Sequence, residues 1–279
     1  GPALRRLREV LVVVEVSTAV VLLVGSGLLV RSFLALQGED PGFQPEGRLA
    51  IYTPLPTSRF PDDSDRLAFA QAGLARLSSI PGVESVAATS LIPVTGSDQI
   101  GSVSIDGRSP DQGEDDISVI AYTVSPGYLE TMAIPLVAGR DFTSGDTGES
   151  ENVVMVSESF AAAYFPDGDA VGRHIRFFGG PSWEIVGITG EVQHYSLGRT
   201  SIPQAYLPIA QLFFAGSFNF VLKTSVPPLS LVPSVRAGIQ AVDPNMPVQS
   251  VRTLEQIIAT DTSTPRFRTL LLTSFSFAA

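Results

Sequence analysis

The sequence predicts an α+β protein with one N-terminal transmembrane helix, and three observations support this prediction. An apolar run occupies Val10–Val30 with a single charged residue. Two strand–helix–strand patterns lie at residues 48–90 and 217–253. Short β-rich runs separated by turn signals fill residues 91–216 between them. We therefore expect a discontinuous α/β subdomain that is interrupted by an inserted β-rich subdomain.

The apolar run reads VLVVVEVSTAVVLLVGSGLLV and has no polar stripe. At about 1.5 Å per residue, a helix of this length spans about 30 Å, the thickness of the hydrocarbon core of a bilayer. Arg5, Arg6 and Arg8 precede it, so residues 1–9 form a basic cytoplasmic flank and residues 32–268 lie outside the membrane. A cleaved signal peptide is the alternative, but the run is long and no small-x-small cleavage site follows.

Three residues inside this run stand out. Glu15 is an acid in a membrane helix, which favours a functional role, contact with a neighbouring helix, or extension of the side chain to the interface. Gly25 and Gly27 permit close packing of membrane helices. The chain ends with the apolar segment 269–279, which we interpret as the start of a second membrane helix. The predicted span is therefore one helix of a bundle rather than a lone anchor.

The two strand–helix–strand patterns look like copies of one unit. Apolar residues at spacings of 3, 4 and 3 occur in both predicted helices, and VESV at Val83–Val86 matches VQSV at Val248–Val251. The matched positions are offset by 165 residues throughout, for example Leu67 and Val232. Such units pair into a ferredoxin-like layer, a four-stranded sheet covered on one face by two helices. Residues 31–47 and 254–268 are predicted stalks that join this layer to the membrane segments.

Composition and charge exclude several functions. Residues 32–265 carry 26 acidic and 12 basic side chains, a net charge of −14, which disfavours nucleic-acid binding. The chain has no cysteine, so it has neither disulfides nor thiolate metal sites. It also lacks a GxSxG nucleophile motif and a GxxxxGK[ST] phosphate-binding loop. We expect no enzyme activity and no cofactor.

Three weaker candidate sites are each better explained by structure than by chemistry. Asp146-Thr147-Gly148 matches the aspartic-protease triplet, but there is no second copy, and we expect an exposed acidic turn. His174 and His194, with Glu191 as the only plausible co-ligand, lack the spacing of a metal site. Glu114-Asp115-Asp116 lacks the spacing of a calcium loop. We therefore predict no catalytic, cofactor-binding or metal residue.

Several stretches together resemble a known family. They are IPGVESVAATSLIPV, VSPGYLETMAIPLVAGRDF, VVMVSESFAAAYFPDGDAVGRHI, WEIVGITGEV and PQAYLPIA. In this order they resemble the MacB-like periplasmic core domain of FtsX-like ABC-transporter permeases. The segment VLVVVEVSTAVVLLVGSGLLVRSF is similar to the helix before the second periplasmic domain of duplicated, acidobacterial-type permeases that lack their own ATPase. The similarity covers nearly the whole chain.

The resemblance implies a porter-like α/β subdomain, discontinuous in sequence, with the β-rich subdomain inserted in it. It implies a multi-pass permease of the bacterial inner membrane whose periplasmic domain relays movement driven by a separate cytoplasmic ATPase. A second permease half or a homodimer, and a periplasmic adaptor, are further partners in this family. The alternative is a periplasmic binding or sensory domain with a single membrane anchor, which the acidic surface and the lack of catalytic groups also fit.

Overall fold

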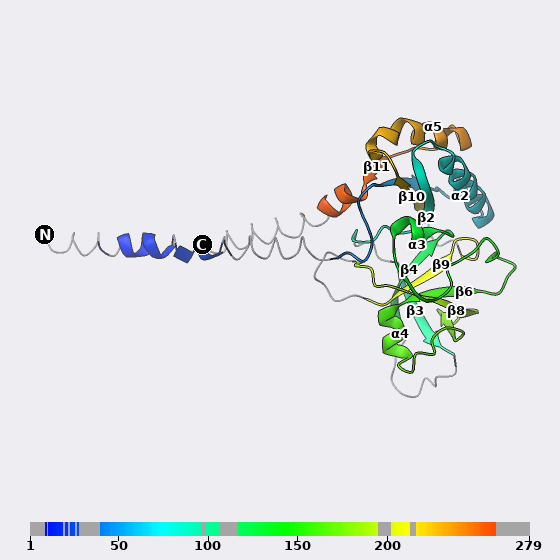
Figure 1. Cartoon of the computed structure of the whole chain (residues 1–279), viewed down its shortest axis with the longest axis horizontal. Coiled ribbons are helices and arrows are strands. Elements are labelled where there is room, and N and C mark those ends of the chain that lie inside the picture. The colour runs from blue at the N-terminus through cyan, green and yellow to red at the C-terminus, as the bar shows by residue number, and fades with distance from the viewer. Residues whose placement is uncertain are drawn as a thin grey trace. The chain divides into compact units, whose positions relative to one another are not determined.

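The computed structural model describes residues 9, 11–18, 20–21, 23–25, 27, 40–95, 99–106, 117–194, 202–212 and 216–260. Contacts divide the chain into two units, Gly1–Asp40 and Pro41–Ala279. Figure 1 labels many of the helices and strands of the second unit.

The first unit is helical at every described residue from 9 to 27. Residues 11–18 form continuous helix with exposed side chains, among them Glu15, and the hydroxyl of Thr18 donates a hydrogen bond of 2.8 Å to the carbonyl oxygen of Val14. No described helix is both long and apolar enough to cross a bilayer. Parts of Val10–Val30 and all of 261–279 lie outside the described residues. Both membrane spans therefore stay predictions.

The second unit contains the expected pairing of the two strand–helix–strand patterns. Its first part has the elements β1 (Arg48–Pro54), α2 (Asp63–Ser78), β2 (Val83–Thr89), β10 (Ser217–Thr224), α5 (Val232–Val242) and β11 (Ser250–Thr253). A short 3₁₀ turn, η2 (Pro228–Leu231), leads into α5. The strands lie in the order β11-β1-β10-β2, and all neighbours are antiparallel. We call this four-stranded part the α/β layer (Figure 1).

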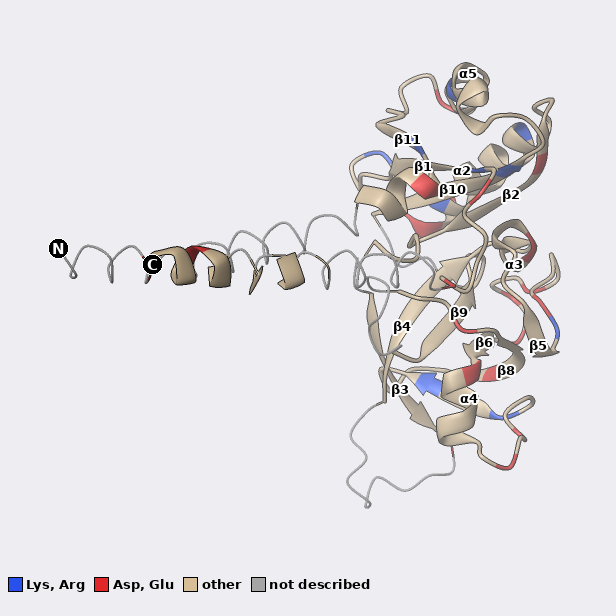
Figure 2. Cartoon of the chain, turned by 60° about the vertical axis from the view of Figure 1, so that its left-hand side comes forward, with Lys and Arg blue, Asp and Glu red and all other residues tan. Residues whose placement is uncertain are grey.

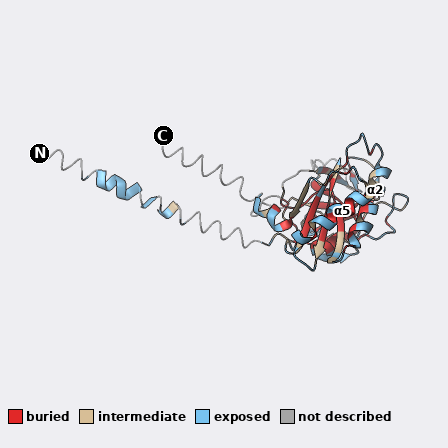
Figure 3. Ribbon diagram, turned by 90° about the horizontal axis from the view of Figure 1, so that it is seen from above, coloured by how far each residue is buried: buried red, intermediate tan, exposed pale blue. Residues whose placement is uncertain are grey.

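Helices α2 and α5 cover one face of the α/β layer. Leu49 and Ile51 of β1 join Phe218, Phe220 and other apolar residues in a core beneath the two helices. Ala50, between them in the sequence, belongs to a different core on the opposite face, as the period of two in a strand requires. Figure 3 shows buried strands next to α2 and α5, whose outer sides are exposed.

The rest of the unit is a closed ring of six strands. They are β3 (Ile100–Ile105), β4 (Ile117–Val124), β6 (Val153–Ser157), β7 (His174–Phe177), β8 (Ser182–Thr189) and β9 (Gln204–Pro208). Pairing runs β4-β3-β7-β8-β6-β9 and closes because β9 pairs in parallel with β4. The short strand β5 (Leu136–Gly139) pairs with β8. We call this part the six-stranded ring.

Side chains inside and outside the ring alternate along its strands. On β4, Val119 and Ala121 belong to the inner core with Trp183, whereas Ile120 and Tyr122 belong to the core outside the ring. Helix α4 (Glu158–Tyr164) contributes Phe160 to the inner core. The β-rich segment thus folds around a core of its own.

The starts of helices α2, α3 (Tyr128–Met132) and α4 lie next to residues that commonly begin helices. Ser157 caps α4, because its hydroxyl accepts a hydrogen bond from the amide of Phe160 at 3.4 Å. Helix α3 begins shortly after Ser125-Pro126, with Gly127 at the N-cap position. Asp62 holds the N-cap position of α2 without a side-chain hydrogen bond.

The α/β layer and the six-stranded ring meet at a short seam. One residue pair, Thr89 with Val124, joins β2 to β4. The amide of Ala88 donates to the Ser125 hydroxyl at 2.9 Å, and the amide of Thr123 donates to the Ser90 hydroxyl at 3.0 Å. Strands of both parts therefore belong to one sheet, although their helix-side and inner cores are separate.

Candidate functional site

Both described ends of the folded unit lead into one core at the seam between the α/β layer and the ring. This junction core contains Phe43 near the start of the unit and Leu254 and Ile257 near the end of its described part, with exposures of 4%, 1% and 8%. It also contains Tyr122 of the ring and Ala50 of the layer. Segments assigned to the two stalks thus begin inside the folded unit.

The entry segment, residues 41–44, is held in place by close backbone contacts and backbone hydrogen bonds. Gly42 has φ +80°, and a Cβ at this position would lie 1.9 Å from the carbonyl oxygen of Glu191, so only glycine fits. The amide of Gln193 donates to the carbonyl of Pro41 at 2.9 Å, and the amide of Gln44 donates to the carbonyl of Met132 at 3.0 Å. The chain therefore enters in contact with the segment after β8 and with α3.

The exit segment is a helix over residues 254–260 that begins with a reciprocal cap. The amide of Gln256 donates to the Thr253 hydroxyl, and the amide of Thr253 donates to the Gln256 side-chain oxygen, both at 3.2 Å. Arg252 Nη2 donates to the Gln256 carbonyl at 3.1 Å and to the Thr260 hydroxyl at 2.7 Å. Sequence inspection missed this helix, although Thr253-Leu-Glu-Gln256 is a recognisable capping box.

A buried polar chain crosses the ring side of the junction core. The Tyr122 hydroxyl and His194 Nδ1 are 2.6 Å apart, and the rings of Tyr122 and Tyr206 stack with centroids 5.0 Å apart. The Tyr206 hydroxyl donates to the Gln204 side-chain oxygen at 2.9 Å, and the Gln204 amide nitrogen donates to the carbonyl of Val192. Burial raises the pKa of Tyr206 well above its ordinary value, so its hydroxyl stays protonated.

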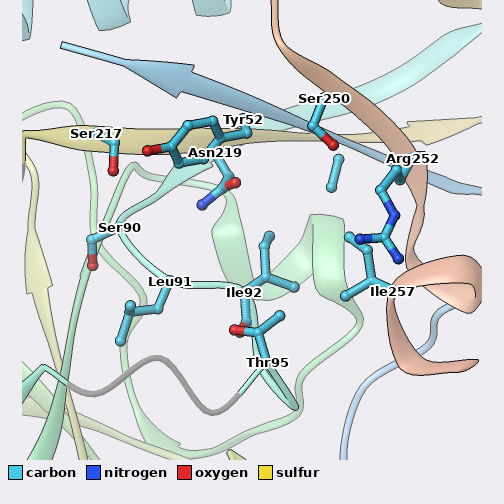
Figure 4. Close-up of a pocket in the computed structure, with 11 residues that line it drawn as sticks. Tyr52, Ser90, Leu91, Ile92, Thr95, Ser217, Asn219, Ser250, Arg252 and Ile257 are labelled. Atoms are coloured by element: carbon cyan, nitrogen blue, oxygen red, sulfur yellow. The ribbon is translucent and has the colours of Figure 1, made fainter. Parts of the chain in front are cut away.

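A pocket of about 530 Å³ opens on the face of the α/β layer opposite to α2 and α5 (Figure 4). Strands β1, β10 and β11 form its floor, the segment after β2 forms one wall, and the exit helix supplies Ile257. Its eleven lining residues are Ala50, Tyr52, Ser90, Leu91, Ile92, Thr95, Ser217, Asn219, Ser250, Arg252 and Ile257. Most are polar and uncharged, and Arg252 is the only charged residue among them.

The structure corrects the expectation for Asp146. The turn itself is exposed at Thr147 and Gly148, as expected, but the Asp146 side chain is only 7% exposed. Arg140 binds both of its carboxylate oxygens at 2.9 Å. Burial disfavours the charged carboxylate, but hydrogen bonds from Arg140 and the Thr143 amide outweigh it and lower the pKa of Asp146. The aspartate stabilises its own loop.

The structure does not bring the histidines and Glu191 together as metal ligands. His194 contacts Tyr122, whereas His174 lies on β7 with Nε2 3.7 Å from a Glu151 carboxylate oxygen. A Glu191 carboxylate oxygen accepts a hydrogen bond from the amide of Ser159. Among the described residues, no group of three or more His, Asp or Glu side chains is placed to hold a metal ion.

The described residues do not test the roles considered for the acidic cluster or for the two glycines of the predicted membrane helix. Glu114-Asp115-Asp116 lies outside them. A Cβ at Gly25 or Gly27 would meet no described atom within 4 Å, so their role in helix packing stays a prediction.

A sequence family model matches most of the chain. The sequence model of the MacB-like periplasmic core domain matches residues 11–251. An uncharacterized ABC transporter permease of Bacillus subtilis (strain 168), YvrN, is 29% identical over 125 residues, which is 44% of this chain and 30% of that protein. The chain therefore spans less than a third of that relative's length in the matched region.

Among solved structures, the fold is similar to the periplasmic region of MacB from Actinobacillus actinomycetemcomitans. The TM-score is 0.54 at 16% sequence identity, covering 82% of this chain and 99% of that one. The extracellular domain of the ABC-type transporter YknZ from Gram-positive bacteria also matches, with a TM-score of 0.44 at 17% identity over 67% of this chain and 88% of the other. At this identity the first likeness shows the fold alone.

Proposed function

Because the chain belongs to the MacB-like periplasmic core domain family, we propose that it is part of an ABC-transporter permease that relays movement across the bacterial inner membrane. In this proposal Val10–Val30 spans the bilayer and residues 32–268 lie in the periplasm. A separate cytoplasmic ATPase supplies the energy, and the chain itself catalyses no reaction. A second permease half or a second copy, and a periplasmic adaptor, complete the assembly.

The observation that supports this proposal most is that both described ends of the folded unit, near Phe43 and Ile257, enter the junction core. Phe43, Leu254 and Ile257 pack in the same cluster as residues of the α/β layer and of the six-stranded ring. Protein cores are close-packed, so a displacement of one end moves its neighbours instead of being absorbed by empty space. Movement of the membrane segments therefore reaches both parts of the unit at one place.

The seam is suited to a change in the angle between the α/β layer and the six-stranded ring. Strand pairing across it is limited to Thr89 with Val124, supplemented by the short hydrogen bonds around Ser90 and Ser125. The α/β layer and the ring keep separate cores on either side of it. Few strand-pair hydrogen bonds need to change when the two parts rotate about this seam, which is compatible with a hinge.

The test uses the full-length permease and its ATPase in lipid nanodiscs, and measures hydrogen exchange with and without ATP. We expect ATP to change amide protection in residues 254–260 and at the seam between β2 and β4. Phe43→Ala should leave ATP hydrolysis in place but abolish these changes.

Phe60→Ala is the matched control for that substitution. Phe60 is also a buried phenylalanine, 8% exposed, but it lies in the core beneath α2 and α5 and not in the junction core. The Phe60→Ala variant should lose a similar amount of folding stability as Phe43→Ala, but its ATP-dependent changes in amide protection should persist. If no ATPase assembles with the permease, or the junction exchanges identically in both states, the proposal is wrong.

A further inference from the structure

The pocket on the α/β layer has the size of a small-molecule site. Its volume of about 530 Å³ lies within the range of roughly 300–1,000 Å³ that is typical of such sites. Tyr52, Asn219 and Ser250 come from three adjacent strands and are paired neighbours across the sheet. Figure 4 shows their side chains around a common space that Leu91 and Ile92 border on the opposite side.

The charge of the pocket is opposite to that of the protein. Residues 32–265 carry a net charge of −14, and Figure 2 shows Asp and Glu residues on helices and loops of the folded unit. The eleven lining residues, by contrast, contain one arginine and no acid. Hydroxyl and amide groups of Tyr52, Ser217 and Asn219 add hydrogen-bond donors that any anionic group needs when it leaves water.

Arg252 keeps hydrogen-bonding capacity for a ligand. Its Nη2 atom is used by the exit helix, through the Gln256 carbonyl and the Thr260 hydroxyl. No described residue accepts a hydrogen bond from its Nε or Nη1 atoms. The side chain extends along Ile257 at one end of the pocket, so a bound anion there would also lie next to an apolar wall (Figure 4).

We propose that this pocket binds a small organic carboxylate with an apolar body. The carboxylate pairs with Arg252, polar atoms near the carboxylate bond to Asn219 and the hydroxyls on the sheet, and the apolar body packs on Leu91, Ile92 and Ile257. One guanidinium matches one negative charge, which favours a carboxylate over a doubly charged phosphate. The carboxylate belongs either to a free small acid or to the C-terminus of a short peptide.

Such a ligand would bridge the floor of the pocket and the exit helix. Ile257 belongs to the exit helix, and Arg252 of β11 is hydrogen-bonded to that helix through its side chain, whereas Tyr52 and Asn219 belong to the central strands β1 and β10. Occupancy therefore holds the exit helix against the α/β layer. The inference does not rest on the relay proposal, because binding is measured without an ATPase.

The experiment titrates the full chain in detergent micelles with N-acetyl-L-leucine, followed by ligand-detected NMR and calorimetry. N-acetyl-L-leucinamide, which has no charge, is the paired probe. The tripeptide Ala-Ala-Leu with a free carboxylate distinguishes a peptide end from a free acid as the source. We expect saturable binding of at least one carboxylate, and binding of the amide that is weaker by about tenfold or more.

Arg252→Gln should weaken carboxylate binding by about tenfold or more, since it removes the charge-assisted hydrogen bond. Arg236→Gln is the matched control, because it removes the same charge from an exposed position on α5, and its binding should equal that of the wild type. Ser250→Tyr fills the pocket without changing charge and should also abolish binding. Equal binding of the amide, unchanged binding by Arg252→Gln, or no saturable binding of either carboxylate would overturn the proposal.

Discussion

The two faces of the four-stranded sheet differ in how they are covered. On one face, α2 and α5 close over an apolar core in which Phe218 and Phe220 are almost fully buried. On the other, α3, the exit helix and the segment after β2 leave the polar pocket open. The two faces belong to the same strands. Successive residues of a strand point to opposite faces, so the residues at alternating positions determine how each face is covered. The closed face maintains the fold, and the open face is available for binding and movement.

The largest expected effect of a substitution is on the closed face, at Phe220. Its side chain is fully buried and its ring lies 4.7 Å from that of Phe218. Phe220→Ala should lower the free energy of unfolding by about 3–5 kcal/mol, because it leaves a cavity that the two helices cannot fill. Chemical denaturation followed by circular dichroism measures this loss. A loss below about 1 kcal/mol would mean that the face is not tightly packed.

The second effect tests how closely α2 approaches the sheet. A Cβ at Gly73 would lie 2.3 Å from the tip of the Phe220 ring, so Gly73→Ala should cost about 1–3 kcal/mol through overpacking. Gly238→Ala on α5 is the matched control. Its Cβ would meet Ile80 at an ordinary 3.5 Å, so the change should be neutral or stabilise the helix by up to about 1 kcal/mol. Equal effects at the two glycines would contradict the close contact.

On the open face, Arg48 joins β1 to α3 through polar contacts. The side chain is 2% exposed, its Nε atom donates to the Thr131 carbonyl at 2.6 Å, and Nη1 donates to the Glu46 carbonyl at 2.9 Å. Arg48→Met keeps an apolar stem but leaves both carbonyls without this donor, so stability should fall by about 1–3 kcal/mol. Hydrogen exchange should show the loss of protection concentrated in α3. Uniform loss across the unit would argue against a local role.

The smallest effect should come from the pocket itself. Tyr52 is 39% exposed on the open face. Tyr52→Phe removes only its hydroxyl and should change the free energy of unfolding by no more than about 0.5 kcal/mol. Thermal unfolding of both proteins provides the comparison. A large loss of stability would show that the pocket residues maintain the fold rather than remain available to a ligand.

Local patterns in the sequence predicted the α/β layer well. The 3, 4, 3 spacing of apolar residues identified α2 and α5, because one helix face of each lies on the sheet. The closing of the six-stranded ring could not be predicted in this way. It depends on parallel pairing of β4 with β9, whose residues are far apart in the chain. Alternation along a strand indicates a buried face but not the partner strand.

The candidate sites were predicted less well for the same reason. Tyr52, Asn219 and Ser250 lie on three strands from opposite ends of the unit, and only the sheet brings them together. Asp146 was expected to be exposed, since the loop sequence is acidic and glycine-rich. Its burial depends on Arg140, six residues earlier, which neutralises the carboxylate. The capping box at Thr253 was visible in the sequence and was overlooked.

The relay is tested most directly by measuring a distance between the α/β layer and the six-stranded ring. The chain has no cysteine, so spin labels can be placed at two exposed positions, Gln71 on α2 and Val171 in the ring part. In the full permease with its ATPase in nanodiscs, we expect the distance distribution to differ between the nucleotide-free and ATP-bound states. An unchanged distribution while the ATPase hydrolyses ATP would contradict a relay through the junction core.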